Sequence, residues 1–304
     1  MRKPALLAAA ALIALSGCAA SPTPEASPTT AAATFPVTVA NNGGEVTIGA
    51  QPGAIVSLSP TATEMLFAIG AGPQVIAVDD QSNFPAEAPT SDLSGFTPNV
   101  EAIVAKQPDL VVVSNDIDNI VASLQAANVP VLVEPAAASL DDTYAQIDQL
   151  GQVTGRTTQA TALVAAMKQR IAAAVASASS GAGATVYHEL DNTMYSATSS
   201  TFIGAVYQSF GLVNIADASP DAATGYPQLS AEWIVDQDPR LVFLADTKCC
   251  AQDAAAFAAR PGFAALTAVT QGGVIPLDDD IASRWGPRTA ELYEAVAAAV
   301  ASVK

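Results

Sequence analysis

Short apolar runs alternate with amphipathic segments along most of the chain. Runs rich in Val, Ile and Leu predict strands buried on both faces of a sheet, and they occur at 54–59, 74–78, 110–113, 129–134, 185–190 and 273–277. Helix-like segments lie between them. This alternation predicts an α/β architecture with mainly parallel sheets. Ligands of such sheets bind beyond the carboxyl ends of the strands, so the loops there are the ones to examine for function.

One helix–strand unit occurs twice. The segment 99–113, NVEAIVAKQPDLVVV, is matched by 229–244, LSAEWIVDQDPRLVFL. Each copy reads as a short helix that opens with a carboxylate, Glu101 or Glu232, then a proline that ends the helix, then an apolar run. Two equivalent units far apart in the chain predict two similar lobes.

A long Ala-rich segment, 157–178, carries apolar residues at helical spacing, among them Leu163, Val164, Met167 and Ile171. It needs a packing partner along its whole length, which a helix lying across both lobes would have. We therefore expect an N-terminal lobe at 54–155, an interdomain helix at 156–180 and a C-terminal lobe at 181–304. Before them, Asn42-Gly43-Gly44 predicts a hairpin.

The N-terminus reads as an export signal. Residues 1–18, MRKPALLAAAALIALSGC, join a basic start to an apolar stretch and small residues ending in Cys18. The apolar stretch is shorter than the ~20 residues of a spanning helix. The pattern resembles the lipobox of bacterial lipoproteins, which implies that Cys18 is acylated; an ordinary cleaved signal is the alternative. Residues 19–53 are expected to form a flexible Ser/Thr/Pro/Ala tether followed by the hairpin.

Composition narrows the classes of function. The chain of 304 residues has a formal net charge of −17, so its surface repels phosphate backbones and nucleic-acid binding is not expected.

With Cys18 acylated, Cys249 and Cys250 are left as adjacent thiols. A strained disulfide between them, two free thiols and intermolecularly paired thiols all remain open, and no histidine nearby supports a metal site.

The loops after the predicted strands mix aromatic side chains, neutral hydrogen-bonding groups and a few charges. This mixture suits a sizeable, partly apolar ligand better than a set of acid, base and nucleophile. The residues that we single out as ligand contacts are Pro60, Phe84, Phe96, Glu189, Tyr195, Asp280, Arg284 and Trp285.

The single histidine, His188, disfavours catalysis. It lies in a predicted strand, where a buried and hydrogen-bonded imidazole is the default interpretation. A Ser-His-Asp triad would have to use it, and the sequence has no G-x-S-x-G turn, no P-loop and no G-x-G-x-x-G after a strand. We expect no enzyme activity, no resident cofactor and no protein-bound metal ion.

Two charged features have both a structural and a functional interpretation. Asp280 and Arg284 can form an ion pair that braces the turn before the last helix, or Arg284 can donate to a ligand beside Trp285. Glu101 and Glu232 can each interact favourably with a helix dipole. The dipole does not explain a matched pair on two lobes.

The region from about 54 to 304 resembles the class III substrate-binding proteins of bacterial ABC importers, which carry cobalamin, ferric siderophores and haem. The segments that carry the resemblance are 55–72 (IVSLSPTATEMLFAIGAG), the two repeats and 278–288 (DDDIASRWGPR). It implies two Rossmann-like lobes joined by one long helix. It further implies that Glu101 and Glu232 dock, one per lobe, on the two permease subunits of an importer driven by ATPase subunits.

The same resemblance implies a ligand class. Asp280 and Arg284 match the positions that contact the ligand in the cobalamin-binding member, although that member lines its site with several tryptophans and this chain has only Trp233 and Trp285. We expect a monomeric, lipid-anchored receptor on the outer face of the cytoplasmic membrane that binds a corrinoid or a ferric siderophore. A haem receptor, a surface sensor and, last, an exported hydrolase are the alternatives.

Overall fold

The computed structural model describes residues 34–178 and 181–302. The predicted signal peptide, Cys18 and most of the predicted tether lie outside the described residues. The predicted hairpin is confirmed: β1 (Val37–Asn41) pairs antiparallel with β2 (Gly44–Ile48). Its turn residues, Asn42 and Gly43, both have positive φ, as the tight turn of a two-residue hairpin requires.

The first lobe is a parallel sheet with helices on both faces. Its strands are β3 (Ile55–Leu58), β4 (Val75–Val78), β5 (Leu110–Val113) and β6 (Val131–Val133), in the order β4-β3-β5-β6. The helices α1 (Pro60–Ala68) and α4 (Leu140–Thr154) pack on one face. The helices α2 (Val100–Val104) and α3 (Ile120–Ala126) pack on the other. Both faces are therefore apolar, which explains the uninterrupted Val/Leu runs.

The second lobe repeats this arrangement. Its strands are β7 (Thr185–Glu189), β8 (Val213–Asn214), β9 (Leu241–Leu244) and β10 (Val274–Pro276), in the order β10-β9-β7-β8, all parallel. The helices α6 (Phe202–Ser209) and α11 (Thr289–Ser302) cover one face. The short helices α7 (Ala231–Gln237), α8 (Ala254–Ala258) and α9 (Thr267–Thr270) lie on the other, and α10 (Asp279–Ser283) follows β10.

The repeated units seen in the sequence occupy equivalent places. Asn99 caps α2 and Ser230 caps α7, each by accepting a hydrogen bond from a backbone N–H. The chain then enters β5 or β9, the strand next to β3 or β7 in its own sheet. The prediction of two similar lobes is confirmed.

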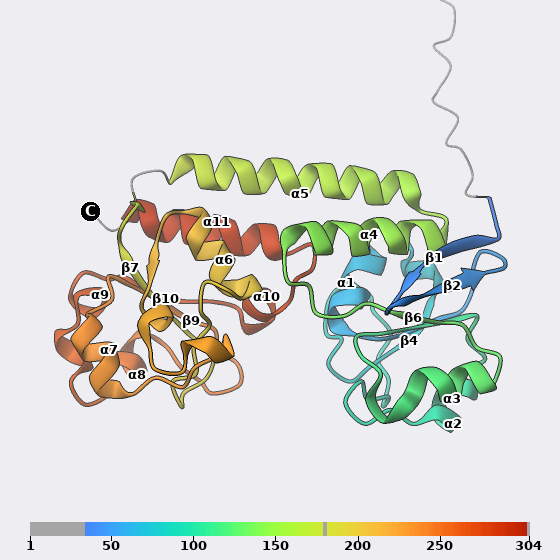
Figure 1. Cartoon of the computed structure of the whole chain (residues 1–304), viewed down its shortest axis with the longest axis horizontal. Helices are drawn as coiled ribbons and strands as arrows, with labels where there is room; N and C mark the ends of the chain where they lie inside the picture. The colour runs from blue at the N-terminus through green and yellow to red at the C-terminus, as the bar shows by residue number, and fades with distance from the viewer. Residues whose placement is uncertain (1–33, 179–180, 303–304) are drawn as a thin grey trace, which may run out of the picture. The chain divides into compact units, whose positions relative to one another are not determined.

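The long helix α5 (Thr157–Ser177) joins the lobes and runs beside α4 and α11 (Figure 1). Its N-terminal half buries Val164 and Met167 in the core of the first lobe. Its C-terminal half buries Ile171 and Ala174 in the core of the second. One apolar stripe thus serves two cores, as the sequence predicted. Within the described residues, no helix has the length and apolarity to cross a membrane.

Candidate functional site between the lobes

The loops at the carboxyl ends of the strands meet along two edges of the sheets. At the first edge, the loop after β4 contacts the segment after β10: Asn83 Nδ2 donates to Asp280 Oδ2 at 3.0 Å. At the second edge, Ala136–Ala138 after β6 share a cavity of about 370 Å³ with residues 200–202 and 223–226 of the second lobe. Because β4 corresponds to β8 and β6 to β10, the two edges are related by the repeat. The loops of the central strands lie between them.

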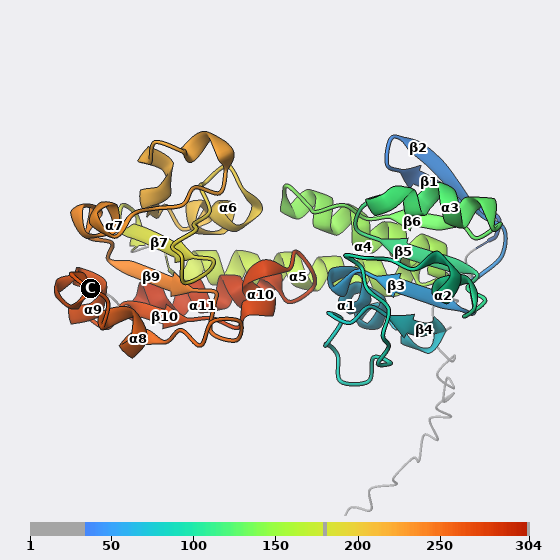
Figure 2. The same cartoon turned by 90° about the horizontal axis from the view of Figure 1, so that it is seen from below.

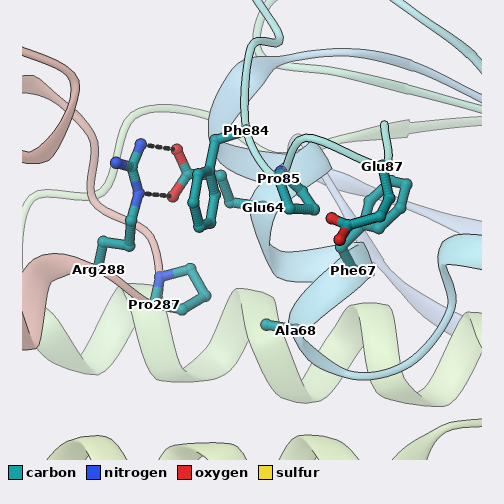
Figure 3. A pocket seen from close by; sticks show the side chains of 8 residues that line it. All are labelled: Glu64, Phe67, Ala68, Phe84, Pro85, Glu87, Pro287 and Arg288. Atoms are coloured by element: carbon teal, nitrogen blue, oxygen red, sulfur yellow. Dashed lines mark hydrogen bonds and ion pairs between the residues drawn. The ribbon is translucent and has the colours of Figure 1, made fainter. Parts of the chain in front are cut away.

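A buried carboxylate joins the lobes at the first edge (Figure 3). Glu64 of α1, whose side chain is 2% exposed, accepts two hydrogen bonds from Arg288, at 2.9 and 2.5 Å. It also accepts one from Arg284 Nη1 at 2.8 Å. Ser59 is the N-cap of α1 and Pro60 follows it, so the Glu64 side chain takes no part in capping the helix. Glu64 is therefore free to pair with the two arginines across the lobes.

Asp280 and Arg284 form the predicted ion pair, with 2.8 Å between Oδ1 and Nη2. Lys248 Nζ lies 2.7 Å from the other oxygen of Asp280. Burial raises the pKa of the Asp280 carboxyl, but hydrogen bonds from Lys248 and Asn83 and the charge of Arg284 outweigh it and hold that pKa below its usual range. The role of both residues as ligand contacts stays a prediction.

The predicted aromatic walls fall into different environments. Phe96 and Tyr195 are 69% and 41% exposed. Phe84 is exposed too, but Arg288 lies 4.2 Å above its ring, and Phe84 lines an apolar cavity of about 290 Å³ with Phe67 and Pro287 (Figure 3). Trp285 is half-buried against the core of the first lobe and donates to Gln146 Oε1 at 3.0 Å. The structure therefore brings only Phe84 into the same cluster as Asp280 and Arg284.

Glu189 is enclosed in the second lobe, with no exposed surface. Arg260 binds both of its oxygens, at 2.7 and 2.5 Å, and Tyr187 Oη donates to it at 2.9 Å. Burial and the charge of Glu189 raise the pKa of the neighbouring Asp246 to about 7. Glu189 as a ligand contact stays a prediction, and the structure shows that a ligand would first have to reach a carboxylate held by Arg260.

His188 is fully buried, and its Nδ1 lies 2.6 Å from Tyr207 Oη. Burial lowers the pKa of His188 to about 3. The expectation of a buried, hydrogen-bonded histidine is confirmed.

The described residues include no group of three His, Cys, Asp or Glu side chains that could hold a metal ion. Cys249 and Cys250 are free thiols.

Two residues that the sequence did not single out, Tyr226 and Arg260, lie at the candidate site or contact one of its predicted residues. Tyr226 is 47% exposed and lines the cavity shared by the lobes. Arg260 holds Glu189. A carboxyl group within an apolar strand indicates either a nearby cation, as for Glu189, or a group that stays protonated, because an unpaired buried charge is too costly. No comparable signal marks Tyr226, which follows a loop of small polar residues.

Glu101 and Glu232 are exposed on the first turns of α2 and α7. Both helices lie on the side of the lobes away from α5 (Figure 1) and both are in view from below (Figure 2). The lobes thus carry one acidic residue each on the same side of the molecule. Their role in docking stays a prediction.

Curated proteins with similar sequences are binding proteins. A cobalamin-binding protein of Halobacterium salinarum is 35% identical over 220 residues, which are 69% of this chain and 59% of that protein. This chain therefore spans less than two thirds of that relative. The uncharacterized ABC transporter substrate-binding lipoprotein YvrC of Bacillus subtilis is 30% identical over 278 residues, 88% of this chain and 86% of the relative.

Solved structures share the fold. The periplasmic heme-binding protein RhuT of Roseiflexus has a TM-score of 0.71 at 25% identity and matches 81% of this chain and 97% of its own. The periplasmic vitamin B12-binding protein of Vibrio cholerae has a TM-score of 0.68 at 23% identity, over 83% of this chain and 97% of its own. The family model described as "Periplasmic binding protein" matches residues 55–281. The chain belongs to the periplasmic binding protein family.

Proposed function

We propose that this protein is the substrate-binding lipoprotein of an ABC importer, and that it captures a corrinoid between its lobes. It binds the ligand and delivers it to the permease, and the ligand is not chemically changed. The ligand lies between the loops of the central strands, bounded by the Asp280–Arg284 network at one edge and by Tyr226 at the other. The cobalamin-binding and B12-binding relatives support this choice of ligand.

The observation that carries the proposal is that the cations around the facing loops are already neutralised. In the part of the chain that the structure describes, Lys248 pairs with Asp278 and Asp280, and Arg260 pairs with Glu189. Arg284 and Arg288 share Glu64. A ferric catecholate carries several negative charges and would have to break these pairs to obtain counterions. A corrinoid is bulky, has little net charge and presents apolar faces and amide arms, which suit the exposed rings of Phe96, Tyr195 and Tyr226.

Delivery to the permease depends on parts of the molecule that do not touch the ligand. The lipid on Cys18 holds the protein at the membrane, and Glu101 and Glu232 contact the two permease subunits. The name of the Bacillus relative, a substrate-binding lipoprotein of an ABC transporter, supports both parts of this proposal. A pair of exposed carboxylates, one per lobe, suits a partner with one basic site on each of two subunits.

Haem is the second candidate ligand. Tyr195 and Tyr226 are both about half exposed, and a phenolic oxygen can serve as an axial ligand of haem iron. His188 is a poor axial ligand, because it is fully buried and bonded to Tyr207. The two propionates of haem would again need cations that are now paired, so the corrinoid ranks first.

A thermal-shift panel tests the proposal with cobalamin, cobinamide, haem, a ferric hydroxamate and a ferric catecholate. A ligand at 100 times its Kd stabilises the folded state by about 2.7 kcal/mol, so the corrinoids are expected to raise Tm by several degrees. Tyr226→Ala reduces this shift, whereas Val213→Ala, at an exposed position of β8, serves as the matched control. A shift by the catecholate alone, or no shift with any ligand, contradicts the proposal.

A further inference from the structure

A separate cavity of about 480 Å³ lies in the first lobe, between the hairpin, the end of β6 and α4. Its walls come from three segments of the chain: 40–44, 133–138, and residues 142, 145, 146 and 149 of α4. It shares Ala136–Ala138 with the cavity between the lobes, so the two cavities adjoin the same segment. The lining residues of this cavity, the hairpin cavity, come from the hairpin and the first lobe.

Glu134 is the unusual residue of this cavity. Its backbone N–H extends the β6 ladder to Val113 O at 2.8 Å. Alternation along the strand therefore directs its side chain to the face of Leu132, on which α4 packs. Glu134 is 4% exposed, and its Oε1 has no hydrogen-bond partner among the described residues. Leaving a buried carboxyl oxygen unpaired is costly, so a ligand that supplies a donor there gains binding energy.

Amide side chains that line the cavity beside Glu134 make hydrogen bonds to other groups, and none of them donates to its Oε1. Asn41 bonds to Val131 O and accepts from Val133 N–H. Gln146 donates to Pro135 O and accepts from Trp285. Gln149 donates to Ala40 O. Glu134 Oε1 is therefore available to a donor supplied by a ligand.

We propose that this cavity binds a short aliphatic amine, whose ammonium group pairs with Glu134 and whose hydrocarbon stem lies against Ala136–Ala138 and Ala145. A cation is favoured because a charge-assisted bond to a carboxylate is about twice as strong as a neutral one. A metal ion is disfavoured, because no three metal-ligating side chains gather anywhere in the described segments. The volume also far exceeds that of a single ion, and the alanines offer an apolar wall.

Binding has a proton-linked signature. Burial raises the pKa of Glu134 to about 8, so the group is mainly protonated at pH 7. The other ionisable side chain that lines the cavity is Asp142 of α4, which caps its own helix with Ser139. Apart from Glu134 itself, the hairpin and the segment after β6 contribute no ionisable side chain to the lining. An ammonium group that binds ionised Glu134 therefore releases about one proton from the protein at pH 7 and almost none above pH 9.

The test titrates the folded protein with n-butylammonium, with 1-butanol as a neutral isostere. Amide NMR shifts locate the binding, and calorimetry in phosphate and in MOPS measures the proton released; Tris is avoided because it is itself a primary amine. We expect saturable shifts in the hairpin turn and at 136–138, proton release at pH 7, and at least about tenfold weaker binding of 1-butanol.

Two variants make the result decisive. Glu134→Gln keeps the shape, removes the charge, and is expected to abolish both the proton release and most of the affinity. Ala145→Leu fills the cavity from an exposed position of α4 and is expected to block binding even if Glu134→Gln folds poorly. Glu87→Gln, an exposed carboxylate at the other apolar cavity, is the matched control and leaves binding unchanged. No saturable binding, or equal binding by Glu134→Gln or Ala145→Leu, overturns the proposal.

Discussion

The pairing of Glu64 with two arginines gives a sharp prediction for Glu64→Gln. The substitution keeps the size of the side chain and removes its charge. Arg284 retains Asp280 at 2.8 Å and Asn83 at 3.0 Å. Arg288 has Glu64 as its only ion-pair partner among the described carboxylates. The variant therefore leaves the guanidinium of Arg288 without a counterion. The site is largely buried, since the side chains of Arg284 and Arg288 are 11% and 12% exposed.

The expected cost lies at the lower end of the range for broken buried pairs. Removing one partner of such a pair costs about 3–5 kcal/mol, and the amide of glutamine can still accept one hydrogen bond. We therefore expect a loss of about 3 kcal/mol in the free energy of unfolding. For a chain of this length about 2 °C accompanies each kcal/mol, so Tm should fall by about 6 °C.

Denaturant unfolding of a double-mutant cycle measures the effect. The cycle combines Glu64→Gln with Arg288→Gln and isolates the coupling between the two residues, which we expect to exceed about 1.5 kcal/mol. Glu87→Gln is the control, because its carboxylate is exposed, and should change stability by less than about 0.5 kcal/mol. A coupling below about 0.5 kcal/mol would show that the pair does not join the lobes energetically.

Three further predictions follow from single groups. Changing both Glu101 and Glu232 to lysine should abolish uptake while corrinoid affinity, measured by calorimetry, stays within about twofold; normal uptake refutes the docking role. His188 has a folded-state pKa of about 3 against a usual 6.5, so the unfolded chain binds the extra proton and stability falls as pH drops from 6.5 towards 3, by up to about 1.4 kcal/mol per pH unit. His188→Gln should flatten this slope in unfolding curves, and an unchanged slope excludes His188 as its source. Glu134 makes stability depend on pH in the opposite direction. Its pKa is raised from 4.5 to about 8, so the stability linked to its protonation is complete below pH 4.5 and is lost as the pH rises to 8. Glu134→Gln should gain stability relative to the wild type over that window, and a constant difference contradicts the assignment.

The repeat and the local patterns predicted the lobes well, because these features depend on neighbours in sequence. The apolar runs ending at Val113 and Leu244 are buried strands. The stripe from Val164 to Ile171 packs into two cores as a bridging helix must. Helix ends were displaced by a residue, as at Ser177 instead of Ala178, because fraying at a terminus leaves only a weak sequence signal.

The candidate site was harder to predict, because its partners are far apart in the chain. Glu64 lies 224 residues from Arg288, and periodicity gives no information about which acid meets which base. Trp285 was expected as an open wall, and the expectation could not include its bond to Gln146, 139 residues away. The exposed Tyr226 gives no local pattern at all. Sequence identified a rich set of polar and aromatic loop residues, and the structure decides which of them contact one another.

Hydrogen exchange with and without cyanocobalamin tests most directly the claim that a bulky ligand is held between two lobes. The account predicts slower exchange on loops of both lobes, at 79–84 and 114–116 in the first and at 190–196 and 222–226 in the second, with α5 unchanged. Protection confined to one lobe, or none at a saturating concentration of the ligand, would contradict it.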